Sequence, residues 1–401
     1  MNKAHIAHHP HLTGAPSGKG GLHRILEGVL SFTRKNTVMV IALVLAAATS
    51  VIVPPDAEYL GYFDFKTLTC LFCVLAVVCA LKNIRFFYML AQQIVRLFKN
   101  ARMCVLALVY VTFIGSMLIA NDMALLTFLP LGYFVLSSTG KHKYMAFTFI
   151  MQNIAANLGG MLTPFGNPQN LYLYTKYNIP VGEFTLIMLP PFLISIAIIT
   201  LCCLVFVKAE ALVFEGESIS MPKGRTILYL ALFALSIAIV FRGIPYLIGL
   251  IVIPAVLLFA DRDALKAVDY PLLLTFVFFF VFSGNLARIQ VIKDFFSQLL
   301  ERNTLLVSVA SCQVISNVPT AILLSQFTQN YRHLLLGVNI GGVGTLIASL
   351  ASLITFREYT NQNKGKTGYY VLLFSAFNFA FLILLSLFVI LLTVFLFLGM
   401  Y

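Results

Sequence analysis

Two breaks in apolar sequence, IANDMA at residues 119–124 and NLGGMLTPFGNPQN at residues 157–170, recur as ISNVPT at residues 315–320 and NIGGVGTLIAS at residues 339–349. In each copy an Asn follows Ile and a small residue, and an Asn-apolar-Gly-Gly run with a Thr three positions on comes later. The breaks therefore recur in the same order in two halves of the chain. Paired interruptions of this kind in a membrane protein point to the binding site of a transporter.

The composition is that of a membrane protein. The chain is 60% hydrophobic and only 10% charged, with a mean hydropathy of +0.93, whereas soluble domains have roughly 25% charged residues. The net charge of +12 comes from Lys and Arg at the ends of apolar segments, which is a topology signal and not a nucleic-acid patch. We expect an integral protein of the cell membrane, with the lipid bilayer as a partner, a cytoplasmic N-terminus and no nucleic acid.

Four regions are predicted along the chain. Residues 1–31 are rich in Gly, Pro and His and form a disordered cytoplasmic tail. Residues 32–207 form the first transmembrane repeat, residues 208–225 a cytoplasmic linker, and residues 226–401 the second repeat. An odd number of crossings separates corresponding spans of the two repeats, so the second repeat is predicted to be inverted in the membrane.

Two apolar regions do not fit simple spans. Residues 103–136 are interrupted by Asn121-Asp122, and residues 305–327 by Asn317-Val318-Pro319, which leaves arms of the second region that cross only about half of the bilayer. Re-entrant hairpins with the polar break at the tip explain both regions. The fold class is therefore an all-α membrane protein, an inverted-repeat transporter with two re-entrant hairpins and two unwound transmembrane helices.

An amphipathic stretch precedes each hairpin, at residues 83–99 and at residues 285–302. Both carry apolar residues at helical spacing with basic residues between them, as do helices that lie in the membrane interface. They could form a collar around a moving domain or serve as simple interfacial linkers.

The breaks supply groups that can bind ions. Half-helix N-termini offer N–H groups to an anion, while half-helix C-termini and unwound carbonyls offer oxygens to a cation such as sodium. Unpaired backbone at membrane depth is tolerated only where protein or a watery cavity satisfies it. The candidate substrate- and ion-binding residues are Asn121, Asp122, Asn157, Gly160, Thr163, Gly166, Asn167, Asn170, Ser316, Asn317, Thr320, Asn339, Gly342, Thr345 and Ser349.

Asp122 is the only acidic residue in the middle of a hydrophobic region, and its counterpart in the second copy is Val318. Intramembrane carboxylates are costly and are functional by default. Asp122 could bind sodium, carry a coupling proton, or cap the second arm of its hairpin. The candidate sodium ligands are Asn121, Asp122, Asn157, Asn317 and Asn339. No other cofactor is expected.

At these motifs the chain resembles the ion transporter superfamily, which includes divalent-anion:sodium symporters, citrate permeases and arsenite permeases. The resemblance rests on Asn121-Asp122-Met123-Ala124-Leu125, on Ser316-Asn317-Val318-Pro319-Thr320 and on the Gly160 to Pro168 run. Val318 departs from the Ser-Asn-Thr motif of dicarboxylate symporters. The resemblance implies a scaffold domain, a transport domain that moves as an elevator, and in many members a homodimer.

The leading functional hypothesis is a secondary transporter for a small anion, such as citrate, a dicarboxylate or an inorganic oxyanion, coupled to sodium or protons. A sodium-proton antiporter that uses Asp122 is an alternative within transport, and an ion channel is an alternative of another class. An enzyme is not expected, because no catalytic His, Cys or Ser-Lys constellation accompanies the breaks.

Overall fold

The described residues are almost entirely helical and form no sheet. The computed structural model describes residues 32–33, 36–212 and 222–398. Six helices in these ranges are long and apolar enough to cross a bilayer. The prediction of an all-α membrane protein is therefore confirmed. The tail predicted at residues 1–31 and most of the linker predicted at residues 208–225 lie outside the described residues.

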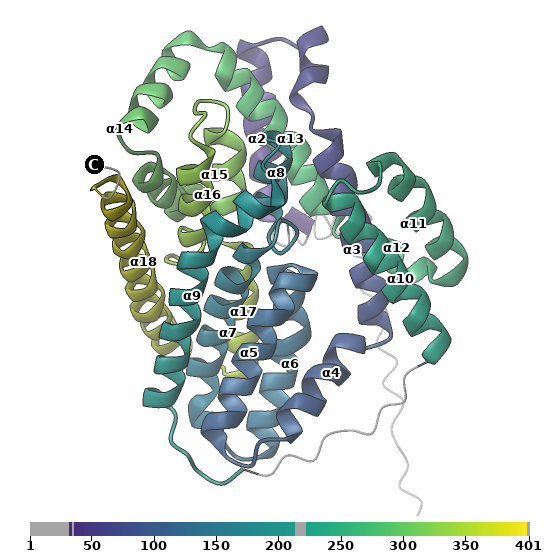
Figure 1. The fold of residues 1–401 in the computed structure, drawn as a ribbon, viewed down its shortest axis with the longest axis vertical. Coiled ribbons are helices and arrows are strands. Elements are labelled where there is room, and N and C mark those ends of the chain that lie inside the picture. Colours follow the sequence, from purple (N-terminus) through teal and green to yellow (C-terminus); the bar gives the residue numbers. More distant parts are fainter. Residues whose placement is uncertain (1–31, 34–35, 213–221, 399–401) are drawn as a thin grey trace, which may run out of the picture.

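The helices are numbered along the chain in Figure 1. The first half contains α2 (Thr37–Ile52), η1 (Ala57–Tyr62), α3 (Phe65–Asn83), α4 (Phe86–Arg96), α5 (Ala101–Ile119), α6 (Asn121–Ser138), η2 (His142–Tyr144), α7 (Met145–Gly159), η3 (Gly160–Leu162), α8 (Pro168–Lys176) and α9 (Val181–Phe206). The second half contains α10 (Lys223–Val240), α11 (Tyr246–Ala260), α12 (Arg262–Lys266), α13 (Tyr270–Arg288), α14 (Gln290–Ile315), α15 (Asn317–Leu324), α16 (Tyr331–Ile340), α17 (Leu350–Gln362) and α18 (Thr367–Leu398).

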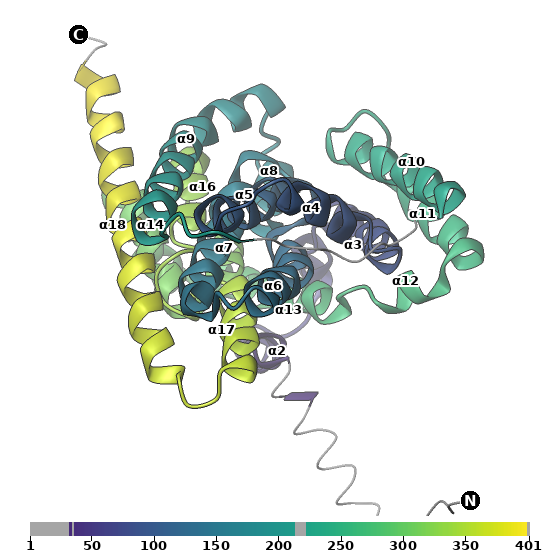
Figure 2. The same cartoon turned by 90° about the horizontal axis from the view of Figure 1, so that it is seen from below.

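The helices pack as two groups. The flanking group consists of α2, α3 and α10 to α13, in which α2 packs on α13 and α3 packs on α10 and α11. The hairpin group consists of α5 to α9 and the helices from the second part of α14 to α18. Figures 1 and 2 show α10 and α11 on one side of the molecule and α18 on the opposite side. Every residue of α7 is buried, so the core lies around this helix.

The hairpin group contains two helical hairpins whose open ends lie at opposite ends of the group. The pair α5 and α6 has its open end beside Glu210, just after the C-terminal end of α9, where Glu210 contacts Lys141. The pair formed by the second part of α14 and α15 has its open end near the start of α9, where Glu183 binds Arg332. Because α9 has 26 residues, these ends are about 39 Å apart along its axis.

Each hairpin follows an amphipathic helix, as the sequence predicts. α4 covers most of the first amphipathic stretch, and the first part of α14 covers residues 290–302 of the second, whose first four residues instead end α13. The chain leaves helical conformation before each first arm, at Asn100, which has φ −138° before α5, and at Asn303, which has φ −164° inside α14.

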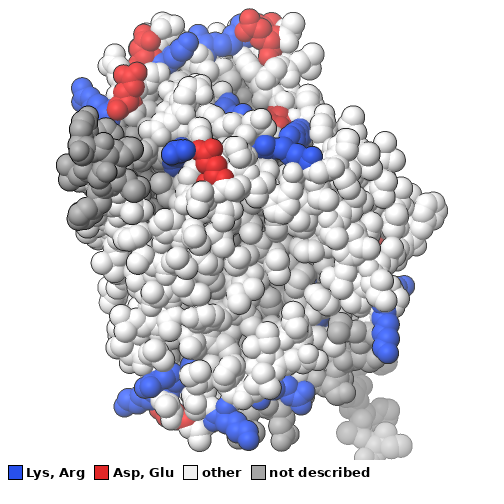
Figure 3. All heavy atoms as spheres, viewed as in Figure 1, with Lys and Arg blue, Asp and Glu red and all other residues white. Residues whose placement is uncertain are grey.

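On the face seen in Figure 3, the charged residues gather toward the two ends of the molecule. Figure 3 shows Lys, Arg, Asp and Glu at the upper and lower ends of the visible face, with a wide band between them that shows almost no charge. Large apolar side chains are exposed on many helices, for example Leu186 on α9 and Leu372 on α18. An uncharged band with exposed apolar side chains is the surface expected for a protein embedded in lipid.

Candidate functional site

The two hairpin tips have the same backbone conformation. Ala120 has φ 65° and ψ 151° between α5 and α6, and Ser316 has φ 75° and ψ 158° between α14 and α15. Positive φ is strained for residues other than Gly and persists only where the surroundings fix it. Here hydrogen bonds from the next residue fix it, because Asn121 donates its backbone N–H to the carbonyl of Gly166 at 3.1 Å and Asn317 donates to that of Ala348 at 2.9 Å.

These acceptors lie in the two helix breaks. α7 ends at Gly159, and the chain turns through η3 before α8 begins at Pro168, while α16 ends at Ile340 and α17 begins at Leu350. Each tip therefore hydrogen-bonds to the break of its own half of the chain. As a result, four helix C-termini and four helix N-termini end at the same place, where they expose carbonyl and N–H groups that have no partner inside their helices.

Threonines tie each break to the first arm of its hairpin. Thr163 donates its hydroxyl to the carbonyl of Met117 at 2.7 Å, and Thr345 donates to that of Gln313 at 3.1 Å. Met117 and Gln313 each lie four residues before the Asn of the tip. The equivalence that the sequence shows in the motifs thus extends to individual hydrogen bonds.

Buried Asn side chains connect the breaks to each other. Asn167 donates to Asn339 Oδ1 at 3.2 Å, and Asn339 donates to Asn170 Oδ1 at 2.6 Å. Asn121 donates to Asn157 Oδ1 at 3.3 Å. All five side chains are at most 3% exposed. Hydrogen bonds between the two halves of the chain therefore run through side chains that the motifs singled out.

The second tip joins this cluster at Gly342. A Cβ atom added to Gly342 would lie 3.1 Å from Asn317 Nδ2 and 3.6 Å from Asn157 Oδ1. Asn157 in turn accepts from Asn121, so the side chains of both tips lie within one polar cluster. Sequence reasoning predicts this meeting of the tips. The position of the cluster in the bilayer and its role in binding remain predictions.

The other candidate residues shape the tips and breaks. Gly160 and Gly166 are in close contact, because a Cβ on Gly166 would lie 2.3 Å from the carbonyl oxygen of Gly160. Ser316 donates to the carbonyl of Ala348, and Thr320 donates to that of Ser316. Ser349 caps the N-terminus of α17. These residues hold backbone in place around the Asn cluster.

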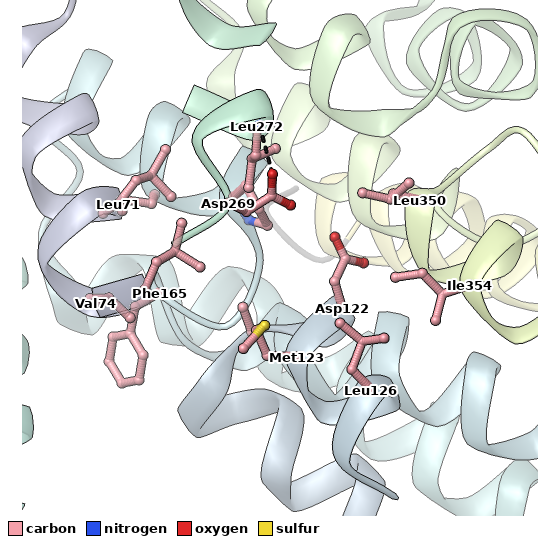
Figure 4. Close-up of a pocket in the computed structure, with 14 residues that line it drawn as sticks. Leu71, Val74, Asp122, Met123, Leu126, Phe165, Asp269, Leu272, Leu350 and Ile354 are labelled. Atoms are coloured by element: carbon pink, nitrogen blue, oxygen red, sulfur yellow. Dashed lines mark hydrogen bonds between the residues drawn. The ribbon is translucent and has the colours of Figure 1, made fainter. Parts of the chain in front are cut away.

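Asp122 does not take part in these hydrogen bonds. Its Oδ1 is buried and has no hydrogen-bond partner, and the backbone N–H of Asp122 is bound by Asn121 Oδ1 at 3.0 Å. Asp122 lines a cavity of about 60 Å³ beside the first tip, together with Asp269 at the start of α13 (Figure 4). Its side chain is therefore not the cap of α6.

The cluster favours small ions of both signs. Within the described part of the chain, no Lys or Arg side chain hydrogen-bonds to the Asn cluster, so an anion there would be bound by amide N–H groups and by the positive ends of helix dipoles. Asn167 Oδ1 is buried and has no hydrogen-bond partner. An unpaired buried oxygen is a ready acceptor for a cation or a water molecule.

Sequence reasoning missed three polar residues that support the site. Gln313 binds the carbonyls of Gly341 and Val343 through Nε2 and the N–H of Thr345 through Oε1. Gln152 donates to Thr112 and to the carbonyl of Phe128, and Asn153 donates to Ser352 and Asn378. The detectable signal was the adjacent pair Gln152-Asn153 inside an apolar run, whereas Gln313 lies outside the duplicated pattern.

Comparisons with known proteins agree with this architecture. Residues 25–333 match a family model described as a citrate transporter. The chain is 35% identical over 309 residues to an uncharacterized transporter of Methanocaldococcus jannaschii, which covers 75% of this chain and 82% of that protein. It is 28% identical over 284 residues to the inner membrane protein YbiR of Escherichia coli, which covers 68% of this chain and 74% of that protein. The chain thus belongs to the citrate transporter family, in agreement with the ion transporter superfamily that its motifs resemble.

Proposed function

We propose that this membrane transporter is a secondary transporter that moves a small anion together with a coupling cation, sodium or a proton. The observation that carries the proposal is the convergence of both hairpin tips and both helix breaks on the buried Asn cluster. Helix N-termini would bind the anion, and carbonyl and amide oxygens would bind sodium. Citrate, a dicarboxylate or an inorganic oxyanion would fit this chemistry, and the family points first to citrate.

We further propose that the two halves are inverted repeats, that both hairpins are re-entrant, and that the hairpin group moves as an elevator against the flanking group. The packing between the groups supports this motion, because it is unequal for the two halves. Between the proposed repeats, α3 corresponds to α13, α6 to α15 and α8 to α17. In the structure, α3 packs on α8 and α13 packs on α15. The pairs that result when the two repeats exchange roles, α3 with α6 and α13 with α17, make at most marginal contact. Exchange of these pairs would expose the site to the other side of the membrane.

The orientation follows from the charges. Lys99 and Arg102 lie at the start of α5, and Lys141 and Lys143 follow the end of α6, so four basic residues gather at the open end of the first hairpin. Since Lys and Arg accumulate on cytoplasmic loops, we propose that this end faces the cytoplasm, together with the N-terminus.

The direct test is uptake into proteoliposomes of a panel of anions, with and without imposed sodium and proton gradients. We expect uptake of one anion class that depends on one of the two gradients. Asn339→Leu should abolish this uptake in a folded protein, because it removes amide groups that bind Asn167 and Asn170. The control is Asn363→Leu, at the far end of α17, which should transport like wild type. Normal uptake by a folded Asn339→Leu variant would place the site elsewhere.

A sodium-proton antiporter is the second candidate. The observation that favours it is the buried, unpaired oxygen of Asp122 beside a cavity. In the same proteoliposomes, sodium-driven proton movement without any anion would identify an antiporter, whereas anion-dependent sodium uptake would identify a symporter.

A further inference from the structure

The cavity beside the first hairpin tip has an unusual lining. Fourteen residues from α3, α6, α8, α13, α17 and the break after α7 surround it, and twelve of their side chains are apolar. The two exceptions are the carboxylates of Asp122 and Asp269, which point into the same space in Figure 4. None of the described Lys or Arg residues lines the cavity. Two carboxylates in apolar surroundings are costly unless one of them is protonated or a positive charge lies between them.

Asp269 has more acceptor capacity than its structural role requires. It caps the N-terminus of α13 by accepting the N–H of Leu272 at 3.0 Å through one oxygen. Asp64 holds the corresponding position before α3, where one oxygen accepts the N–H of Thr67 and the other accepts its hydroxyl. Leu272 has no hydroxyl, so the second oxygen of Asp269 lacks this partner. Asn or Ser would cap a helix equally well, so capping alone does not require a carboxylate.

Asp122 contributes the second, independent observation. Its Oδ1 is fully buried without a hydrogen-bond partner, although Asn121 already satisfies the backbone at the start of α6. The cavity of about 60 Å³ exceeds the roughly 10–15 Å³ that a single water-sized occupant requires. There is thus room for a small cation with water beside it.

We propose that Asp122 and Asp269 bind one sodium ion between them in this cavity, at a site separate from the Asn cluster. Calcium requires six to eight oxygen ligands, and magnesium retains several waters that apolar walls would not hydrogen-bond. Sodium gives up its water more readily than magnesium, and the carboxylate oxygens together with water in the cavity would supply its ligands. Sodium binding at this site does not depend on the proposed function, but the role of the bound ion in transport rests on it.

The site would link the two helix groups. Asp122 belongs to the hairpin group and Asp269 to the flanking group, so the bound ion contacts both. It would hold the first hairpin tip against the start of α13 in the packing seen here, and it would lose one carboxylate when the groups separate. Ion release would then accompany the elevator motion, which is what coupling requires.

The test is sodium binding to the purified protein in detergent, without substrate, by equilibrium dialysis with radioactive sodium. Asp269→Asn and Asp269→Ser should each bind one sodium fewer per chain than wild type, because both keep the cap and remove the carboxylate. Asp122→Asn should lose the same ion, and the double variant with Asp269→Asn should lose no more than either single variant. The matched control is Asp64→Asn, which caps α3 outside the cavity and should bind as wild type does.

Two results would overturn the proposal. The first is an unchanged number of bound sodium ions in a folded Asp269 variant. The second is a variant that changes proton uptake but not sodium binding, which would identify the occupant as a proton. Transport is measured separately. Loss of one sodium ion in a protein that moves no anion would therefore sustain this site and reject the anion transporter. Gradient-driven anion uptake by wild type, together with unchanged sodium binding in the Asp269 variants, would sustain the anion transporter and reject this sodium site.

Discussion

Individual polar residues determine how many hydrogen bonds fix the backbone of each helix break. Gln313 binds three backbone groups of the second break, whereas its counterpart in the first half is Met117, which has no hydrogen-bonding amide. Gly344 lies against this side chain with φ +124°, where only a glycine fits, because a Cβ there would lie 2.1 Å from Gln313 Oε1. The second break is therefore fixed by a side chain that the first break lacks.

Replacement of this glutamine should reveal its contribution. Gln313→Met introduces the residue of the first half and leaves the carbonyls of Gly341 and Val343 without their amide donor, so we expect a loss of about 1–3 kcal/mol in the free energy of unfolding. SDS titration in mixed micelles measures it. The control, Gln290→Met on the exposed start of α14, should change this free energy by less than about 0.5 kcal/mol. Equal effects of the two substitutions would show that Gln313 does not hold the break.

At the scale of elements, the segment after α9 closes the open end of the first hairpin. Ala101 donates its backbone N–H to the carbonyl of Glu210 at 2.8 Å, and Arg102 donates to that of Val207 at 2.7 Å. The Glu210 carboxylate binds Lys141 at 2.9 Å and also binds Lys143. Both arms of the hairpin are thereby fastened to the end of α9. The hydrogen bond from Lys143, then that from Lys141, lowers the pKa of Glu210 to about 2.

This shift predicts a pH dependence. Because the folded protein lowers the pKa of Glu210 from its usual 4.5 to about 2, the stabilisation is complete above the higher value and is lost as the pH falls toward the lower one. The melting temperature of Glu210→Gln should therefore lie below that of wild type at neutral pH, and the gap should close as the pH approaches 2. Asp263→Asn, which breaks an exposed pair with Lys266, is the control and should show almost no gap. A gap for Glu210→Gln that does not depend on pH would refute this link.

The elements themselves were largely predictable from sequence, because Asn, Gly and Pro interrupt apolar runs at the places where helices end. The paired tips at Asn121 and Asn317 and the two helix breaks follow from that pattern. Asp269 could not be recognised as a neighbour of Asp122, because it reads as an ordinary helix cap and only the packing of α13 brings it to the cavity. Gln313 was missed because a single polar residue in an apolar helix has no fixed spacing that identifies its partners.

At the scale of the whole molecule, the two halves have equivalent motifs but unequal surroundings. The α8 and α15 side of the hairpin group packs on the flanking group, and the α6 and α17 side packs on it little. Sequence cannot predict this choice, because duplicated motifs allow both packings. Contacts formed only on the packed side must therefore select the conformation seen here. One such contact is Arg242, between α10 and α11, which donates to the carbonyl of Tyr174 at 2.8 Å and lies 4.2 Å from the centroid of its ring.

Loss of this contact should shift the conformational equilibrium. Arg242→Ala removes a cation–π contact and a hydrogen bond between the two groups, together about 0.5–2 kcal/mol, which is roughly a two- to thirty-fold change in the population ratio. Double electron–electron resonance measures the distance between the two groups. The spin labels are attached at the exposed residues Leu186 and Ile227 after replacement of the native cysteines. We expect the distance of the present packing to lose population to a second one.

The matched control for this shift is Arg262→Ala, whose guanidinium, among the described residues, hydrogen-bonds to the carbonyl of Leu258 one turn earlier in the flanking group. It removes an arginine of the same charge without touching the hairpin group, so its distance distribution should equal that of wild type. A single, unshifted distance for Arg242→Ala would mean that the unequal packing is fixed by the fold, and the elevator proposal would then lose its structural support. A second, populated distance would support movement of the hairpin group against the flanking group, which an exchange of packing partners requires.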